Sequence, residues 1–240
     1  GAYAGRNRQI RMATKRIPVS LGQVGSIRLF AGLPEESLKV LAAASTESRF
    51  VKDEVVFLKG DPSSGLFAVA SGRVKMVCQG PSGEEKVIDV RGAREVFGEE
   101  GLLHDLPYGY MVSALSNTCL LHLDRQSLQD LFDTSSRFAL QMLAHMSHRV
   151  FAGMRDIEDF RTRAPLERLA GFLLDQCALV RHLQPKVNLL APKHVIASRL
   201  GMTPESVSRC LRDMAEDRIL ASRGAVITIL DRERLGALVA

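Results

Sequence analysis

The sequence predicts an α+β protein made of a β-roll, a long helix and a carboxyl-terminal winged helix-turn-helix. Residues 49–124 contain short apolar runs separated by glycine, proline and serine turns. Residues 136–160 repeat apolar side chains at alternating steps of three and four, and residues 192–217 form two helical patterns joined at a glycine. The boundaries that follow are a flexible basic tail (1–24), a β-roll (25–134), a long helix (135–162) and a winged helix-turn-helix (163–240).

A helix is expected ahead of the roll, over Ile27–Ala44, because its apolar spacing is helical and Leu33-Pro34-Glu35-Glu36 is a start signal. The roll is predicted from six short strands: Glu54–Lys59, Leu66–Ala70, Arg73–Cys78, Lys86–Val90, Tyr110–Ala114 and Cys119–Leu123. Turn signals such as Gly60-Asp61-Pro62 and Ser71-Gly72 separate them. A meander of this kind closes best as a small barrel or roll.

The long helix carries a seam of apolar residues with the spacing of a coiled coil. The predicted seam consists of Leu143, Met146, Val150, Gly153, Ile157 and Phe160. Two copies of the chain can pair along it, which predicts a homodimer. The alternative is a long helix docked on its own roll, because the repeat lasts only about three heptads. His145 and His148 point away from this seam and are expected on a solvated helix face rather than in a metal site.

Residues 192–217 predict a helix-turn-helix. The apolar stripe of the first helix is formed by Val195, Ile196 and Leu200. Gly201 supplies the turn, because glycine adopts positive φ at little cost. Thr203 is the expected N-cap of the second helix, with Pro204 at the first helical position, where a missing N–H costs nothing. Ser206 stands at the third helical position in place of Glu or Gln, so the reciprocal capping box is absent.

The second helix is predicted to have an apolar inner face and a polar outer face. The inner residues are Val207, Leu211 and Met214, and the outer residues are Glu205, Ser208, Arg209 and Arg212. Arg can bind guanine O6 and N7 with two hydrogen bonds, Glu can accept from cytosine N4, and Ser is a versatile short partner. The side chains predicted to contact DNA are Thr203, Glu205, Ser206, Ser208, Arg209 and Arg212. The alternative is an ordinary amphipathic hairpin with a solvated charged face.

The sequence after this helix strengthens the DNA-binding hypothesis. The β-branched run 219–230 is broken by Arg223-Gly224, which predicts a hairpin wing. Basic and acidic residues number five and none over positions 1–20, 14 and 19 over 21–160, and 13 and eight over 161–240. A basic carboxyl-terminal part suits phosphate neutralisation, whereas the acidic middle argues against nonspecific coating of nucleic acid. Double-stranded DNA is therefore the expected partner.

Cysteine spacing and hydropathy exclude several other classes. The cysteines are Cys78, Cys119, Cys177 and Cys210, which lie too far apart for a zinc knuckle, an iron–sulfur loop or a redox dithiol. We expect them to be buried free thiols in a reducing cytoplasm. No apolar run approaches the ~20 residues that span a bilayer, and the amino terminus lacks the apolar centre of a signal peptide, so no membrane partner is expected.

The competing class is an enzyme: a metal-dependent β-barrel, or an enzyme's regulatory subunit with an incidental helical tail. A barrel oxygenase needs a histidine-rich metal set on its strands, and the roll offers only His104 and His122. The sequence shows no nucleophile elbow, phosphate loop or paired acid and base. We therefore expect no catalytic residue and no metal site.

The order of roll, helix and winged helix resembles the Crp/Fnr family of bacterial transcription regulators, over residues 25–240. The motifs that carry the resemblance are Leu29-Phe30-Ala31-Gly32-Leu33, Ser71-Gly72-Arg73-Val74-Lys75, Phe97-Gly98-Glu99 at the start of the ligand loop, and Glu205-Ser206-Val207-Ser208-Arg209. The resemblance implies a cyclic-nucleotide-binding-like sensor roll, a dimerisation helix and a TTGAT-N4-ATCAA palindrome. It implies that Glu205 and Arg209 contact the C·G and G·C pairs and that Ser208 reads the neighbouring T·A pair. Pro204 stands where cyclic-AMP-type readers carry Arg, which favours TTGAT over TGTGA half-sites.

The sensor roll departs from two subgroups of that family. Cyclic-nucleotide binders need an Arg-Ser pair for the buried phosphate, and the corresponding residues 106–110 hold no cation, so cyclic AMP is not expected as the effector. The first cysteine is Cys78, so an amino-terminal iron–sulfur cluster cannot form. The chain is most similar to haem-associated, nitric-oxide-responsive members, or to members without a small ligand.

A candidate effector pocket follows from this comparison: Gly98, Glu99, His104, Tyr108 and Tyr110. His104 is a candidate haem iron ligand, and the alternative is a surface histidine beside a packed loop. A redox role for Cys78 or Cys119 is a further hypothesis, against which stands inert burial in strands. The family resemblance also implies transcription activation through contacts with RNA polymerase. The effector itself stays open.

Overall fold

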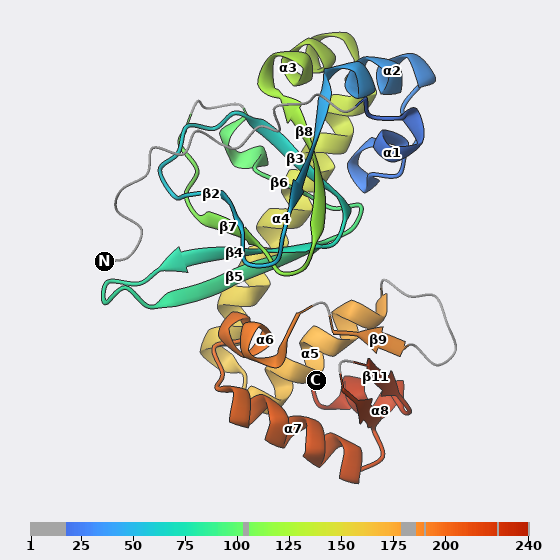
Figure 1. Cartoon of the computed structure of the whole chain (residues 1–240). Helices are drawn as coiled ribbons and strands as arrows, with labels where there is room; N and C mark the ends of the chain where they lie inside the picture. The colour runs from blue at the N-terminus through green and yellow to red at the C-terminus, as the bar shows by residue number, and fades with distance from the viewer. Residues whose placement is uncertain (1–17, 103–105, 179–185, 190, 225, 240) are drawn as a thin grey trace. The chain divides into compact units, whose positions relative to one another are not determined.

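The computed structural model describes residues 18–102, 106–178, 186–189, 191–224 and 226–239 (Figure 1). The chain divides into two compact units, Gly1–Ser147 and His148–Ala240.

Two four-stranded antiparallel sheets form the roll of the first unit. One sheet has the order β1 (Ser45–Phe50), β8 (Thr118–Asp124), β3 (Gly65–Ser71) and β6 (Val96–Phe97). The other has the order β2 (Val55–Phe57), β7 (Met111–Ala114), β4 (Arg73–Gln79) and β5 (Glu85–Gly92). This confirms the predicted β-roll, and it adds β1 and β6, which the sequence patterns did not indicate.

An aromatic core fills the roll between the two sheets. Phe57 stacks on Tyr108 with ring centroids 3.7 Å apart, and Phe67 stacks on Phe97 at 5.2 Å. All four rings are buried. The predicted turn at Ser71-Gly72 joins β3 to β4, and Gly72 has φ +85°, a conformation that side chains other than glycine rarely adopt.

Three helices gather at one end of the roll (Figure 1): α1 (Leu21–Gly25), α2 (Glu35–Ala44) and α3 (Arg125–Thr134). The prediction of one helix over Ile27–Ala44 is wrong in its first half, where a 3₁₀ turn, η1 (Arg28–Phe30), precedes a break. Gly32 has φ +75° there, and Pro34 disfavours a helical conformation for the residue before it, so α2 begins only at Glu35.

The long helix α4 (Ser136–Thr162) is continuous over 27 residues. Its first turns pack against the roll: Phe138 and Met142 are buried in the core beneath α1, α2 and α3, and Met146 is partly buried against the same cluster. The amino-terminal half of α4 is therefore docked on its own roll.

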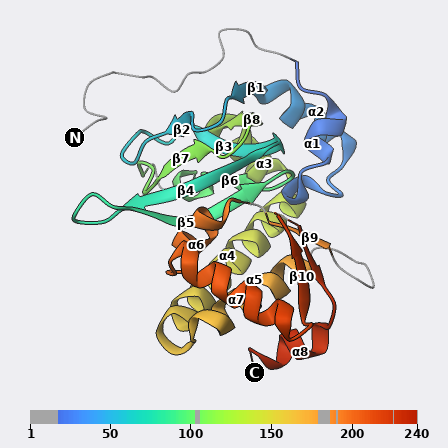
Figure 2. The same ribbon diagram turned by 60° about the horizontal axis from the view of Figure 1, so that its bottom comes forward.

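The second unit confirms the predicted winged helix-turn-helix. Its elements are α5 (Pro165–Ala178), β9 (Lys186–Asn188), α6 (Lys193–Arg199), α7 (Pro204–Glu216), β10 (Leu220–Arg223), β11 (Val226–Ile229) and α8 (Arg232–Ala237). The three strands pair in the antiparallel order β10-β11-β9. Both α6 and α5 contact α7, which lies in front of α5 in Figure 2. None of the described helices is long and apolar enough to cross a membrane.

Candidate nucleic-acid interface

The turn between α6 and α7 is fixed by a glycine cap. The Gly201 N–H donates to the Ser198 carbonyl at 3.3 Å, and the Met202 N–H donates to the Ala197 carbonyl at 2.8 Å. This is the Schellman pattern, in which the residue after the C-cap is left-handed, and Gly201 has φ +58°. The predicted role of Gly201 in the turn is therefore confirmed.

The first turn of α7 begins as the sequence predicted. Thr203 is the N-cap, and its hydroxyl accepts from the Ser206 N–H at 3.2 Å, with Pro204 at the first helical position. The Thr203 hydroxyl also lies 3.2 Å from the Ser206 hydroxyl. Both hydroxyls are thus engaged in the cap of α7.

The outer face of α7 presents four polar side chains. Glu205, Arg209 and Arg212 are exposed, and Ser208 is half-buried. The inner face is buried and consists of Val207, Cys210, Leu211 and Met214. Hydrogen bonds from the backbone of Glu205 and from the Thr203 hydroxyl lower the pKa of Glu205, so its carboxylate is an acceptor. Among the described residues, neither Arg209 nor Arg212 has a hydrogen bond or ion pair to another side chain, which leaves both guanidinium groups available to a ligand.

A second basic projection lies at the wing. β10 and β11 pair from Leu220↔Ile229 to Arg223↔Val226, and Gly224 at the turn has φ +62°. Arg223 is exposed beside this turn. The Arg-Gly break located the hairpin correctly, and it was also the signal from which Arg223 could have been proposed as a contact.

Apolar side chains lie exposed along α4, and only part of this face coincides with the predicted seam. Leu143, Val150 and Ile157 are 66%, 54% and 59% exposed. Three further exposed residues lie outside the predicted seam: Leu140, Phe151 and Met154. Leu140 and Met154 were detectable, because positions 140, 143, 147, 150, 154 and 157 also follow steps of three and four, although position 147 is a serine; Phe151 lies outside this series.

The other predicted seam residues have different surroundings. Met146 packs on the roll, because the roll covers that face of the helix. Gly153 is exposed, with open space where a Cβ would stand. The Phe160 ring lies over Gly201 and Arg168 within the second unit.

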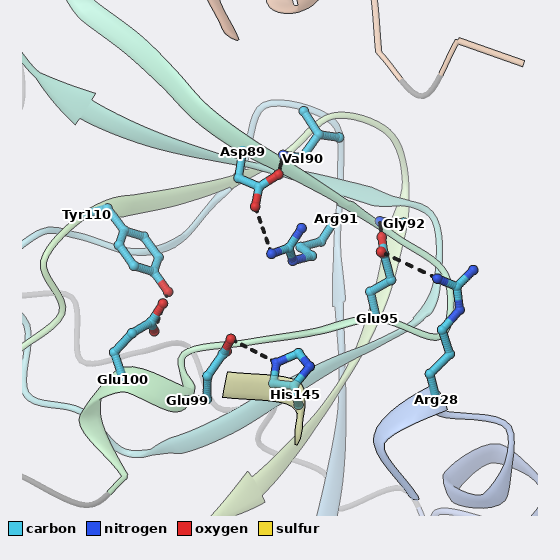
Figure 3. A network of polar contacts seen from close by, with 10 residues as sticks. All are labelled: Arg28, Asp89, Val90, Arg91, Gly92, Glu95, Glu99, Glu100, Tyr110 and His145. Carbon is cyan, nitrogen blue, oxygen red and sulfur yellow. Dashed lines mark hydrogen bonds and ion pairs between the residues drawn. The ribbon is translucent and has the colours of Figure 1, made fainter. Parts of the chain in front are cut away.

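The predicted effector residues Glu99 and Tyr110 belong to a polar network in the first unit (Figure 3). Gly98 has φ +85° and precedes the 3₁₀ turn η2 (Glu99–Gly101). The Glu99 side chain is only 1% exposed, and its Oε1 accepts from His145 Nε2 of α4 at 3.0 Å. The expectation that His145 lies on a solvated face is therefore wrong, because the Glu99 carboxylate binds it.

Two further side-chain contacts belong to this network. The Tyr110 hydroxyl donates to Glu100 Oε2 at 2.8 Å, and Arg91 pairs with Asp89 at 2.7 Å. Burial and the neighbouring Glu99 raise the pKa of Glu100, and burial raises the pKa of Tyr110, so this phenol is a donor. With Glu95 and its ion-pair partner Arg28, the side chains drawn in Figure 3 include four carboxyl groups and two arginines.

The other predicted effector residues do not join this network. Tyr108 is a core residue: its ring stacks on Phe57, and its hydroxyl accepts from the Ser64 N–H at 3.2 Å. His104 lies outside the described residues. No group of three or more His, Cys, Asp and Glu side chains in the described part of the chain could hold a metal ion.

The expectation of buried thiols is confirmed for two of the four cysteines, whereas Cys78 and Cys119 are half-buried. Burial, together with Glu47, raises the pKa of Cys119 to about 11, and Cys177 and Cys210 are buried. Cys78 is half-buried against the aromatic core. A protonated thiol is a poor nucleophile, so the geometry gives no support to a redox role for Cys119.

Comparisons with known proteins agree with this geometry. A cyclic nucleotide-binding domain model matches residues 47–135, and a Crp-like helix-turn-helix domain model matches residues 167–238. The probable transcriptional regulator flp of Lacticaseibacillus casei is 26% identical over 86% of this chain and 93% of that relative. The transcriptional activator protein anr of Pseudomonas aeruginosa is 26% identical over 78% of each chain. The structure of FixK2 from Bradyrhizobium japonicum has the same fold, with a TM-score of 0.74 and 23% identity over 82% of this chain and 98% of that one.

The fold, the polar face of α7 and the matched domains define a DNA-binding transcription regulator and not an enzyme. The chain belongs to the Crp/Fnr family.

Proposed function

We propose that two copies of this chain read a TTGAT-N4-ATCAA palindrome through α7. The outer face of α7 supports this proposal, because it combines an ionised Glu205, a half-buried Ser208 and an Arg209 with no side-chain partner in the described part of the chain. From Glu205 to Arg212 the helix rises about 10 Å, which is about three base-pair steps. Arg209 binds guanine O6 and N7, Glu205 accepts from cytosine N4, and Ser208 contacts the adjacent T·A pair. Thr203 and Ser206 hold the helix end toward the backbone phosphates.

Pairing of the two copies occurs in this proposal along the exposed apolar face of α4. Six large side chains are solvent-exposed there: Leu140, Leu143, Val150, Phe151, Met154 and Ile157. Full burial of one such side chain stabilises an assembly by about 1.5–3 kcal/mol, so covering this face provides enough free energy for a dimer. A twofold pair then places two α7 helices about 34 Å apart, one turn of DNA.

The palindrome is tested by fluorescence anisotropy with TTGAT and TGTGA duplexes that differ only in the half-site. We expect tighter binding to TTGAT. Arg209→Ala should weaken binding to TTGAT by about 1–3 kcal/mol and relax discrimination at one base pair, whereas Lys86→Ala, an exposed change in the roll, should leave it unaltered. A preference for TGTGA, or a uniform loss in Arg209→Ala across all sequences, contradicts the assigned readout.

We propose that the signal reaches the roll without cyclic AMP and without an iron–sulfur cluster, as in the haem-associated and redox-responsive subgroups. The Glu99, Glu100 and Tyr110 network supports the first exclusion, and the cysteine positions support the second. Titration with cyclic AMP should give no heat. Haem is tested separately by the absorbance spectrum after expression with added haem: a Soret band lost in His104→Ala supports an iron ligand there, and no band removes haem from the proposal.

We propose further that the bound dimer activates transcription in the cytoplasm by contact of roll and wing surfaces with RNA polymerase. Activation is the commoner outcome in this family, and the Pseudomonas relative carries the name of an activator. Transcription in vitro from a promoter with an upstream TTGAT palindrome should rise when the protein is added. A fall in transcript would identify a repressor.

A further inference from the structure

The last turn of α4 packs against the helix-turn-helix through the aromatic ring of Phe160. A Cβ built on Gly201 would lie 2.5 Å from Phe160 Cε1 and 3.1 Å from Cδ1. The ring therefore occupies the space that any side chain at position 201 would need. Gly201 thus serves both the left-handed turn and this close approach.

A second contact holds the same ring from α5. The Arg168 guanidinium carbon lies 5.6 Å from the centroid of the Phe160 ring, within the range of a cation–π interaction. Arg168 Nε is buried and has no hydrogen-bond partner among the described residues. Phe160 is therefore bounded by the turn that precedes α7 and by α5, all within the second unit.

The contact between the Phe160 ring and the helix-turn-helix is not closely packed. Phe160 is 48% exposed and borders a cavity of about 70 Å³, whose lining also includes Asp156, Arg168, Phe172, Arg199 and Leu200. Because the ring is not enclosed by core, its removal would leave the buried cores of the unit in place. Its removal would instead change how the turn between α6 and α7 packs against α4.

We infer that Phe160 is a positioning residue, which sets the orientation of α6 and α7 relative to the end of α4 and so the separation at which two recognition helices meet DNA. This inference rests on the proposed dimer. It assigns Phe160 to the contact between α4 and the helix-turn-helix instead of to the dimer seam. Loss of the ring should therefore alter the spacing between half-sites that the dimer accepts, more than the affinity of one reader for one half-site.

The test measures affinity for TTGAT palindromes with spacers of two to six base pairs, and for a duplex with one half-site. We compare the wild type with Phe160→Leu, which removes the ring, with Phe160→Tyr, which keeps it, and with the exposed control Glu158→Ala. The wild type, Phe160→Tyr and the control should share a sharp optimum at four base pairs. Phe160→Leu should lose about fivefold at that spacer, the size of one cation–π contact of ~1 kcal/mol, and show a flatter profile with the half-site affinity within about twofold.

Two results overturn the inference: an unchanged spacer profile in Phe160→Leu, or an equal loss on the half-site and the palindrome, which indicates a local structural role. Circular dichroism verifies that the variant is folded, and Phe160→Met replaces it if it is not. A wild type that shows no spacer preference, or that sediments as a monomer on DNA, overturns the proposed dimer and this inference together. The wild-type arm therefore separates the two failures.

Discussion

The contact between His145 and Glu99 should contribute measurably to the stability of the roll. His145→Leu replaces the imidazole with an apolar side chain of similar size. It removes the donor that lies 3.0 Å from the Glu99 carboxylate, which is 1% exposed. Removing one partner of a buried pair costs 3–5 kcal/mol, because the remaining charge is left inside. The His145 side chain is 24% exposed, so water replaces part of the donor, and we expect a loss of about 2 kcal/mol in the free energy of unfolding.

Two further variants isolate this effect. Glu99→Gln combined with His145→Leu removes the buried charge as well, so the double variant should recover about 1 kcal/mol or more relative to His145→Leu. His148→Leu is the matched control, because His148 is exposed one turn along the same helix, and it should change stability by less than about 0.5 kcal/mol.

The assay is urea unfolding followed by near-ultraviolet circular dichroism of tyrosine. The chain has no tryptophan and three tyrosines, of which Tyr108 and Tyr110 are buried in the roll, so this signal reports on the first unit. Equal unfolding free energies for His145→Leu and His148→Leu would refute the reasoning. A double variant less stable than His145→Leu would show that the charge of Glu99 is not what destabilises the single variant.

Three other results are expected. Arg218 has φ +58°, so Arg218→Gly should stabilise the second unit by about 1 kcal/mol, seen as a higher melting temperature; a lower one contradicts the assigned strain. Burial lowers the pKa of His122 in the folded protein. As the pH falls, the imidazole is therefore protonated in the unfolded chain before it is protonated in the folded chain, and the free energy of unfolding should decrease below pH 6.5. His122→Asn should show a smaller fall, and an identical pH profile would rule out His122 as its source. Because burial raises the pKa of Cys119 to about 11, its alkylation by iodoacetamide at pH 8 should be on the order of 100-fold slower than that of a free thiol, measured by peptide mass; comparable rates contradict an inert site.

The helix-turn-helix could be predicted because its signals are local. The Gly201 turn, the Thr203 cap and the Arg223-Gly224 wing each depend on a few neighbouring residues, and the structure has them where the sequence placed them. The boundaries of the strands in the roll were harder to predict from the sequence. β1 has the polar sequence STESRF, and its strand conformation comes from pairing with β8, more than 60 residues away in the chain.

The polar network around Glu99 and the exposed face of α4 could not be predicted for the same reason. Glu99 and His145 are 46 residues apart, so no sequence spacing relates them. Two apolar stripes with steps of three and four run along α4, and the roll decides between them by covering Met146 and leaving Leu140 exposed. Periodicity identified the helix, and tertiary packing selected its free face.

In α7, the side chains that anchor the helix are different from those that face outward. Its cap is made by Thr203 and Ser206, and its anchoring face is buried, whereas Arg209 and Arg212 have no hydrogen bond or ion pair to another side chain among the described residues. Exchanges at these outward positions leave the scaffold untouched. In the proposed readout, operator preference can therefore diverge between gene duplicates by a few substitutions at these positions.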